Sequence, residues 1–344
     1  MDPLRLQKIN AAYAKLRIAI VGDFCLDRYL EIDPAKKEIS IETGRPVHNV
    51  VNVRSQPGGA GTILNNLVAL GVGTIFPVGF CGEDGEGFEL RRALEKTRGV
   101  NARHFLQTSA RRTFTYCKPL VIRPNRPPEE LNRLDSKNWT ATPTLVQRQI
   151  ASSLAALAPR VDAMILLDQV DLPETGVITR AVLRTVAALV KSHPRLQIIS
   201  DSRRGLKDYP PVILKMNRAE LRRLTGGRGR LDLSTVKKQA RQLAAKNKRM
   251  VFVTLSEDGM LGASPTGEVE HLPAFPIRGP IDIVGAGDAV TANLIAALTA
   301  GASLIEALEL ASAAASLVIH QLGTTGTASI AGMARLLSRH SGPP

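Results

Sequence analysis

The amino-acid sequence predicts an α/β fold in which helices cover both faces of a mainly parallel central sheet. Two observations support this class. Short apolar runs alternate along the chain with segments of helical apolar spacing, and several apolar runs end in glycine or polar turn residues. The chain has 344 residues, 44% of them hydrophobic, which is enough to bury a large core. No repeat or linker divides it, so we expect one domain over residues 1–344.

The first half opens with a buried strand at Arg17–Val21, followed by the turn Gly22-Asp23. Two stretches, about Leu30–Arg54 and His104–Asp135, are rich in β-branched and charged residues without helical period. We expect them to pair into a small separate sheet. The other elements expected here are a helix at Thr62–Leu70, a strand at Thr74–Val78 and a helix at Gly87–Lys96.

The second half continues the alternation that is typical of a parallel sheet. Helices are expected at Leu145–Leu157, Val177–Lys191 and Leu233–Ala245, strands at Ala163–Leu167, Leu196–Ser200 and Met250–Leu255, and a hairpin at Gly259–His271. Two helices rich in Ala and Leu, Asp288–Ala300 and Leu304–Ile319, are expected to close the chain.

The composition favours small anionic ligands over nucleic acid. Lys and Arg number 45 against 31 Asp and Glu, and the formal charge of +14 draws anions such as nucleotides or sugar phosphates toward the surface. The charge alone can equally draw nucleic acid. The basic residues are scattered, so we interpret them as a solvated basic face. Aromatic residues make up only 4% and leave few stacking platforms for single-stranded nucleic acid. A nucleic-acid partner is therefore not expected.

The cysteines indicate a reducing compartment. Cys25, Cys81 and Cys117 are odd in number and form no CxxC pair, which fits neither a disulfide framework nor a zinc site. The N-terminus is charged without an apolar signal-peptide core, and no stretch reaches the ~18 apolar residues of a membrane span. We expect a soluble cytoplasmic protein without a membrane partner.

The sharpest motif is the segment DIVGAGD, residues 282–288, which leads directly into an Ala/Leu-rich helical run. Two glycines and an alanine leave backbone N–H groups uncovered at a helix N-terminus, where they favour an anion. Asp288 in the first turn could accept a proton from an attacking hydroxyl. The alternative is an Asp that simply caps the helix after a glycine turn, and the local pattern does not decide between the two.

A second motif, PGGAG at residues 57–61, leads into a helix with Asn65 and Asn66. Paired glycines let a polyol approach the backbone closely, and the asparagines can hydrogen-bond to hydroxyls. A plain glycine turn is the alternative.

Two further segments carry polar residues at strand ends. In NRAE, Asn217 and Glu220 could form a capping box, or could hold water around a Mg²⁺ bound to nucleotide phosphates. In TLSEDG, Thr254, Ser256 and Gly259 could contact phosphate or form an ordinary turn.

Some enzyme classes are not supported. The sequence contains neither a GxxxxGK[ST] P-loop nor a GxGxxG fingerprint, so a Walker-type ATPase and a nicotinamide dehydrogenase are disfavoured. Its six histidines show no HExxH or other metal-ligand spacing.

Taken together, the order and spacing of these motifs resemble the ribokinase-like, or PfkB, carbohydrate kinases over about Arg17–Thr327. DIVGAGD resembles their C-terminal signature, PGGAGTILNN their N-terminal one, and NRAE their NxxE element. The segments VGDFCLDRYL, LNRLD and HQLGTTG are most similar to the sugar-kinase part of enzymes that phosphorylate heptose 7-phosphate. The resemblance implies a ribokinase-like fold whose small sheet serves as a lid and as a homodimer surface.

The resemblance also implies roles for individual residues. Asp288 would be the catalytic base and Gly285, Ala286 and Gly287 the anion hole. Asp27, Gly58, Gly59, Thr62 and Asn66 would bind the substrate. Asn217 and Glu220 would organise Mg²⁺ and ATP, and Asp282 would help place a monovalent cation, for which K⁺ is the candidate. The nucleotide site would be lined by Thr254, Ser256, Gly259 and Ser312. Thr62 and Ser312 stand where the family often has asparagine, and Ile283 replaces a threonine.

The leading expectation is therefore phosphoryl transfer from ATP to a hydroxyl of a sugar or sugar phosphate. The alternatives are a nucleoside kinase on the same fold and a non-catalytic relative that binds a sugar or nucleotide. The departures at Thr62 and Ser312 bear on the identity of the substrate and on ATP affinity, whereas the base and the anion hole match the family pattern.

Overall fold

A large, mostly parallel sheet forms the centre of the computed structural model, which describes residues 1–227, 229 and 231–340. Within those residues the sheet has nine strands in the order β14-β13-β12-β11-β10-β9-β1-β4-β5. Their bounds are β1 Arg17–Gly22, β4 Thr74–Gly82, β5 Phe105–Thr108, β9 Ala163–Asp168, β10 Gln197–Ser202, β11 Ile213–Asn217, β12 Val251–Thr254, β13 Met260–Ala263 and β14 Val269–Leu272. Only β13 and β14 run antiparallel to their neighbours, so the predicted parallel sheet and closing hairpin are confirmed.

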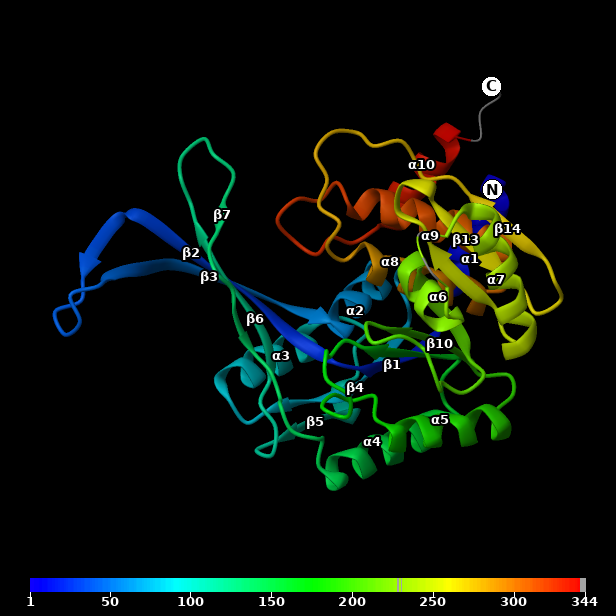
Figure 1. Ribbon diagram of the computed structural model, residues 1–344, viewed down its shortest axis with the longest axis horizontal. Coiled ribbons are helices and arrows are strands. Elements are labelled where there is room, and N and C mark those ends of the chain that lie inside the picture. Colours follow the sequence, from blue (N-terminus) through cyan, green and yellow to red (C-terminus); the bar gives the residue numbers. More distant parts are fainter. Residues whose placement is uncertain (228, 230, 341–344) are drawn as a thin grey trace.

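Helices cover both faces of this sheet, as predicted. One face packs against α1 Pro3–Tyr13, α2 Ala60–Ala69, α3 Gly85–Lys96, α8 Ala286–Thr299, α9 Leu304–Val318 and α10 Ile330–His340. The other packs against α4 Thr144–Leu157, α5 Arg180–Ser192, α6 Arg218–Thr225 and α7 Leu233–Asn247. Alternate residues of β1 enter the two cores, Ile18 and Ile20 on one side and Ala19 and Val21 on the other. Figure 1 shows α4 and α5 across the sheet from α8 and α9.

A second, smaller sheet extends from the body, as the sequence predicted. Its strands are β2 Phe24–Ile39, β3 Pro46–Gly59, β6 Phe114–Val121, β7 Glu129–Glu130 and β8 Leu134–Ser136. The long β2–β3 hairpin reaches far out from the large sheet (Figure 1). Its extent differs from the prediction, because Phe105–Thr108 pairs with β4 and belongs to the large sheet. Both β2 and β3 are also longer than expected and run into the body at Phe24 and Gly59.

Two helix predictions were wrong. The chain does not close with α9, because α10 follows it and buries Met333, Leu336 and Leu337 in the core. Helix α5 begins at Arg180 instead of Val177, since the Thr179 side chain accepts a hydrogen bond from the N–H of Val182 and so caps the helix. Within the described part of the chain, no helix combines the length and apolar character needed to cross a bilayer.

Candidate active site

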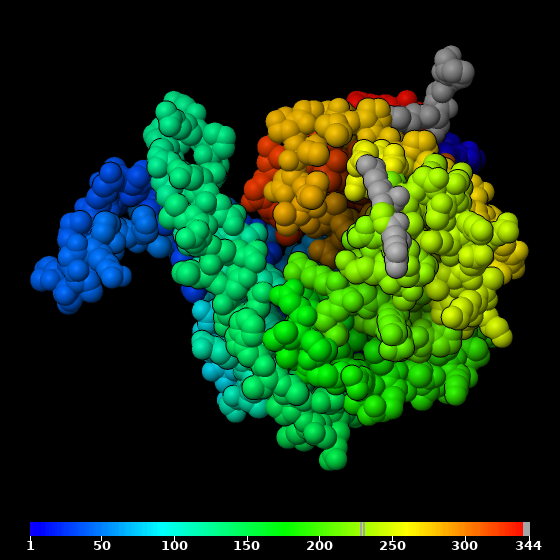
Figure 2. All heavy atoms as spheres, viewed as in Figure 1, coloured from blue at the N-terminus to red at the C-terminus, as the bar shows by residue number. Residues whose placement is uncertain are grey.

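Polar residues gather where the parallel strands end. The last residue of each strand, or its direct neighbour in sequence, is polar at the ends of β1, β9, β10, β11 and β12: Asp23, Asp168, Asp201, Asn217 and Thr254. These carboxyl ends lie at one edge of the sheet, which is where open α/β sheets bind ligands. Figure 2 shows the molecule hollowed between the β6–β7 arm and the orange segment that precedes α8.

Helix α8 presents a bare N-terminus at this edge. Gly285 is its N-cap residue with φ 82°, a left-handed conformation that favours glycine. Among the described residues, none accepts a hydrogen bond from the N–H groups of Gly287 or Asp288. The reading of Asp288 as the N-cap is therefore wrong. Asp288 is the third residue of the helix, and its partly exposed carboxylate is free to act beside the uncovered amides.

A buried ammonium group adjoins this helix start. A Cβ on Gly287 would lie 3.1 Å from Nζ of Lys215, so the ammonium approaches the first turn of α8 because position 287 has no side chain. Lys215 Nζ donates to Asp201 Oδ2 at 2.6 Å, and the hydroxyl of Thr291 donates to the same oxygen at 3.1 Å. The result is an anion cradle of backbone amides with a fixed positive charge beside it.

The Asp288 carboxyl titrates near neutrality. Burial, followed by the nearby Asp201 carboxylate, raises its pKa to about 7, although Lys215 and Arg203 pull the pKa down. Such a group is largely ionised slightly above neutral pH and basic enough to accept a proton from a hydroxyl.

The part of the candidate site around Asp27 on β2 is called the acceptor end, because the sequence resemblance predicts that the substrate binds there. A Cβ on Gly58 would lie only 2.5 Å from Oδ2 of Asp27, so the carboxylate packs directly against the backbone there. Gly59 caps α2 with φ 58°, and Thr62 in the first turn of α2 brings Cγ2 to 3.4 Å from a Cβ built on Gly285. The structure thus joins the two glycine motifs, which are over 200 residues apart in sequence.

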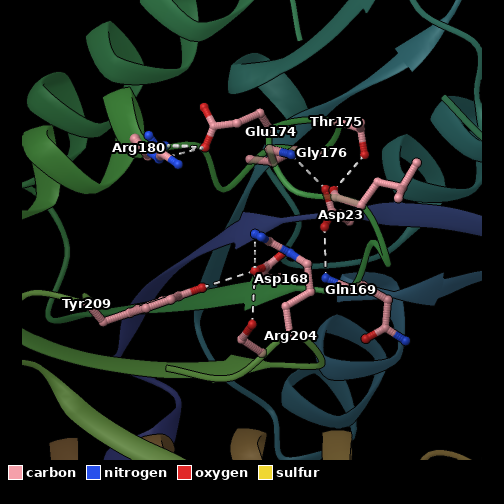
Figure 3. Close-up of polar contacts among 12 residues, drawn as sticks. Asp23, Asp168, Gln169, Glu174, Thr175, Gly176, Arg180, Arg204 and Tyr209 are labelled. Carbon is pink, nitrogen blue, oxygen red and sulfur yellow. Dashed lines mark hydrogen bonds and ion pairs between the residues drawn. The ribbon is translucent and has the colours of Figure 1, made fainter. Parts of the chain in front are cut away.

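Asp23 fixes the walls of this acceptor end. Its carboxylate accepts hydrogen bonds from the N–H of Gln169 at 2.8 Å and of Val177 at 2.7 Å, and its carbonyl accepts from Ala60 at 3.0 Å. Figure 3 shows Asp23 pointing into the segment after β9. Burial, reinforced by the Asp168 carboxylate, raises the pKa of Asp23 to about 7. Asp23 therefore fixes residues 169 and 177 through its carboxylate and the start of α2 through its backbone carbonyl.

Asp168 is committed to structural contacts. It accepts hydrogen bonds from Ser202 at 2.9 Å, from Arg204 Nη2 at 2.6 Å and from the Tyr209 hydroxyl at 3.3 Å (Figure 3). The Arg204 guanidinium is thereby held by Asp168, whereas that of its neighbour Arg203 faces the side chain of Gln169.

Asn66 lies beneath the acceptor end and is fully buried. Its amide nitrogen donates to the carbonyls of Thr62 at 3.0 Å and Gly326 at 3.4 Å, and its oxygen accepts from Ala328 N at 3.4 Å. Because backbone groups take both N–H donors of the amide and one lone pair of its oxygen, the geometry favours a role in joining α2 to residues 326–328 over direct contact with a sugar.

The expected nucleotide residues fall into two groups. Asn217 pairs with Thr254 across β11 and β12, and both line a pocket of about 380 Å³ together with Ser256. Gly259 at φ 87° shapes the turn beside them, where a Cβ would meet the Leu272 carbonyl at 2.0 Å. Ser312 lies apart on α9 and does not line this pocket.

Asn217 and Glu220 form the capping box that the sequence allowed. The Asn217 side chain accepts from the Glu220 N–H at 2.9 Å, and the Glu220 carboxylate accepts from the Asn217 N–H at 2.7 Å. Burial raises the pKa of Glu220, while the bond to Asn217 N lowers it. No group of three or more acidic, histidine or cysteine side chains in the described residues is arranged to hold a metal ion.

Asp282 anchors the segment before α8. Its N–H donates to the carbonyl of Ile319 at 2.7 Å, and its carboxylate accepts from Val284 N at 3.0 Å. This places Asp282 between the C-terminal end of α9 and the anion cradle.

The profile of the pfkB family of carbohydrate kinases matches residues 16–331. The chain belongs to that family. Several curated relatives carry the name Bifunctional protein HldE: that of Bradyrhizobium sp. (strain ORS 278) is 30% identical and that of Rhodospirillum rubrum 31% identical. These alignments cover 93% and 94% of this chain but 63% of each relative, so the chain spans about three fifths of the length of these relatives.

Solved structures of pfkB-type kinases share the fold. Arabidopsis thaliana ribokinase, complexed with ribose and ATP, superposes with a TM-score of 0.65 at 19% identity, covering 94% of this chain and 98% of that one. Escherichia coli phosphofructokinase-2 in complex with substrates and products gives a TM-score of 0.70 at 17% identity, covering 95% and 100%. The ribokinase-like fold, with its large sheet and second smaller sheet, is thus confirmed.

The sequence analysis overlooked three charged residues of this candidate site: Lys215, Asp201 and Arg203. A signal was present, because each is a charged residue in or directly after an otherwise apolar strand, in the segments ILKMN and IISDSR. A charged side chain at the end of a buried strand needs an oppositely charged or hydrogen-bonding partner, so it indicates a polar site at that edge of the sheet.

Proposed function

We propose that the chain transfers the γ-phosphoryl group of ATP to a hydroxyl of a sugar or sugar phosphate, with Asp288 as general base. One observation carries this proposal: the Asp288 carboxylate, with a pKa of about 7, lies in the first turn of α8 beside the amides of an anion cradle and the Lys215 ammonium. Membership of the carbohydrate kinase family supports the reaction class.

The proposed chemistry uses both parts of this arrangement. As the hydroxyl oxygen bonds to the γ-phosphorus, its proton passes to Asp288 and the bond from phosphorus to the β–γ bridging oxygen breaks. The Ala286 N–H donates to the Ile283 carbonyl at 3.2 Å, so of the three amides expected to form the anion hole those of Gly285 and Gly287 would stabilise negative charge on the transferred group. Lys215 would add a fixed cation.

The nucleotide is proposed to enter from the pocket at Asn217, Thr254 and Ser256, with Gly259 shaping the turn and Ser312 toward the adenine side. The solved ribokinase with ATP supports the choice of nucleotide. Glu220 fits a Mg²⁺ reached through water, since one of its oxygens is bonded to Asn217 N and none of the described acidic clusters could bind a bare ion. When bound, Mg²⁺ would neutralise charge on the phosphates.

A monovalent cation is proposed near Asp282, which lies six residues before Asp288 and is only partly exposed. Escherichia coli phosphofructokinase-2 has been solved in complex with potassium, which supports K⁺ as the first ion to try. Oxygen ligands of this kind suit a hard cation.

The acceptor is proposed to bind between Asp27, Gly58, Gly59 and Thr62, with Asn66 holding α2 in place. The relatives named HldE, together with the sequence resemblance, make a heptose 7-phosphate the first candidate. The Asp27 carboxylate can accept hydrogen bonds from sugar hydroxyls that approach the bare backbone of the two glycines.

The second sheet is proposed to act as a lid and dimer surface within a single domain, in a cytoplasmic enzyme. Closure would exclude water from the transfer step. The β2–β3 hairpin exposes apolar side chains that a second copy of the chain could cover: Ile39, Ile41, Val50, Val51 and Val53.

The test is a screen of ATP consumption with sugars, sugar phosphates including heptose 7-phosphate, and nucleosides, with products identified by phosphorus NMR. We expect a phosphorylated sugar or sugar phosphate. Transfer only to nucleosides would instead identify a nucleoside kinase. Ligand-induced thermal stabilisation without transfer to any acceptor would contradict the proposal and indicate a non-catalytic relative.

A further inference from the structure

One face of the second sheet combines carboxylate, tyrosine and lysine side chains. Strands β2 and β6 pair in parallel, with Asp27 beside Tyr116 and Tyr29 beside Lys118. Residues two apart on a strand share a face, so these four side chains lie on the same face of the sheet. That face is the one on which Asp27 meets Gly58 at the acceptor end.

Cations stack over both tyrosine rings. Arg54 and Lys118 lie 4.8 and 5.0 Å from the centre of the Tyr29 ring, and Arg133 and Lys137 lie 4.9 and 5.9 Å from that of Tyr116. Three of the four also pair with carboxylates: Arg54 with Glu31, Arg133 with Asp135, and Lys137 with Asp171. Lys118 forms no ion pair with any carboxylate of the described residues.

A second cation that forms no ion pair within the described chain, Arg203, comes from the large sheet. It follows β10 directly, and its backbone N–H donates to the Asp168 carbonyl at 3.0 Å. Its guanidinium faces the side chain of Gln169, whose amide oxygen, when turned toward it, accepts bonds of 2.7 and 3.2 Å. Gln169 in turn borders Gly59, at 3.7 Å from a Cβ built there. The neutral amide is the one polar partner of this guanidinium within the described chain.

Lys118 and Arg203 both lie near enough to the acceptor end of the site to influence the Asp27 carboxylate electrostatically. Burial raises the pKa of Asp27, and Lys118, Arg133 and Arg203 all oppose that rise. Arg203 also lowers the pKa of Asp288. Since Arg133 is already paired with Asp135, the two cations left for a ligand are Lys118 on one sheet and Arg203 on the other.

We propose that Lys118 and Arg203 together bind a phosphate group carried by the acceptor, and so select a phosphorylated sugar over a neutral one. This inference rests on the proposed function. A guanidinium and an ammonium suit phosphate oxygens, the first as a planar fork and the second as a point charge. Asp27 takes the hydroxyls, because its negative charge repels the phosphate. A phosphate held by both cations also spans the two sheets and favours the closed arrangement of the lid.

The test compares two variants, Arg203→Gln and Lys118→Met, with Arg54→Gln as the control. Arg54 stacks on the same Tyr29 ring as Lys118 but is paired with Glu31. Binding of heptose 7-phosphate and of the same heptose without phosphate is measured by calorimetry in the absence of ATP. Each test variant is expected to weaken binding of the phosphorylated sugar by about tenfold or more. Binding of the neutral sugar should change by less than about twofold, and the control should change neither.

Equal losses for both sugars, or no loss for either, would overturn the inference. So would a wild-type chain that binds none of a series of sugar phosphates more tightly than the matching neutral sugars. The binding assay is independent of turnover. If the variants lose phosphate selectivity but the wild type transfers no phosphoryl group, the proposed function fails and the phosphate site stands. If turnover is found and selectivity is unchanged in the variants, the phosphate site fails alone.

Discussion

The ammonium of Lys215 donates a hydrogen bond of 2.6 Å to Asp201, and both groups lie beside the first turn of α8. The ion pair is buried, with the Lys215 side chain only 7% exposed. Asp201 and Asp288 together raise the pKa of Lys215 against the lowering effect of burial, so the ammonium keeps its charge at neutral pH. A permanent cation thus lies beside the helix start at which the proposed phosphoryl transfer would develop negative charge.

Replacing this cation should slow the chemical step. For Lys215→Met we expect kcat to fall by about 10²-fold or more, the usual loss when one fixed donor to a transition-state anion is removed. The variant also leaves Asp201 buried without its partner, at a cost of about 3–5 kcal/mol of unfolding free energy. Steady-state kinetics and urea unfolding of the same samples measure both effects. As a control, Thr291→Val removes a hydroxyl that lies 3.1 Å from both Asp201 Oδ2 and the Gly287 carbonyl but leaves the cation in place, so it should keep most of kcat.

The activity should depend on pH through Asp288. Below its pKa of about 7 the carboxyl is protonated and cannot act as a base, so kcat/KM should rise with pH through this region and then level off. A flat profile across that range would argue against Asp288 as the base.

The same raised pKa has a consequence for stability. A carboxyl whose pKa is higher in the folded than in the unfolded state destabilises the fold as pH rises, because the folded state holds the extra proton. Asp288→Asn should therefore raise the melting temperature more at about pH 8 than at about pH 5. Calorimetric scans at the two values measure the difference, and an equal change at both would contradict it.

Asp23 should act as a positioning residue. In Asp23→Asn one of the two backbone N–H groups, of Gln169 or Val177, would face an amide NH₂ instead of an oxygen. We expect a loss of about 1–3 kcal/mol in unfolding free energy and a larger rise in KM for the acceptor than for ATP. Equal changes in the two KM values would mean that Asp23 serves the fold in general. Asp23→Glu tests whether a carboxylate alone restores the acceptor KM.

The hairpin should mediate self-association. Ile41 is 98% exposed and Val51 48% exposed on the β2–β3 hairpin, which is unusual for apolar side chains without a partner. Replacing both with Asp should shift a dimer toward monomer in sedimentation experiments. The same replacement at Leu145, an exposed apolar residue on α4, is the control and should leave association unchanged. An unaltered dimer in the hairpin variant would place the interface elsewhere.

The sequence predicted the fold well because hydrophobic periodicity fixes the alternation of strands and helices. Helix α10 was not predicted, because residues 322–332 are rich in glycine and polar residues, which are typical of a chain end without regular structure. In the structure Met333 and Leu336 nevertheless form a buried face of this helix. It assigned residues 105–108 to the wrong sheet, since which sheet a strand joins is set by tertiary pairing with β4.

Only part of the candidate site could be recognised in the sequence, for a similar reason. Motifs with glycines mark where a backbone must be bare, so Gly58, Gly59 and Gly285 stood out in the sequence. The sequence did not single out the charged residues Lys215, Asp201 and Arg203. Their role depends on which distant groups their side chains contact in the folded chain. Lys215 can approach α8 because Gly287 has no side chain. The two residues are 72 positions apart in the sequence, and no local sequence pattern reveals their contact.

The most direct test of the account is the turnover of Asp288→Asn with the acceptor found in the screen. The variant keeps the size of the side chain but cannot accept a proton, and α8 remains capped by Gly285. We predict a fall in kcat of about 10³-fold or more, within the range that a general base contributes, with the dissociation constant of ATP unchanged. A kcat within about tenfold of the wild type would contradict the assignment of Asp288 as the general base.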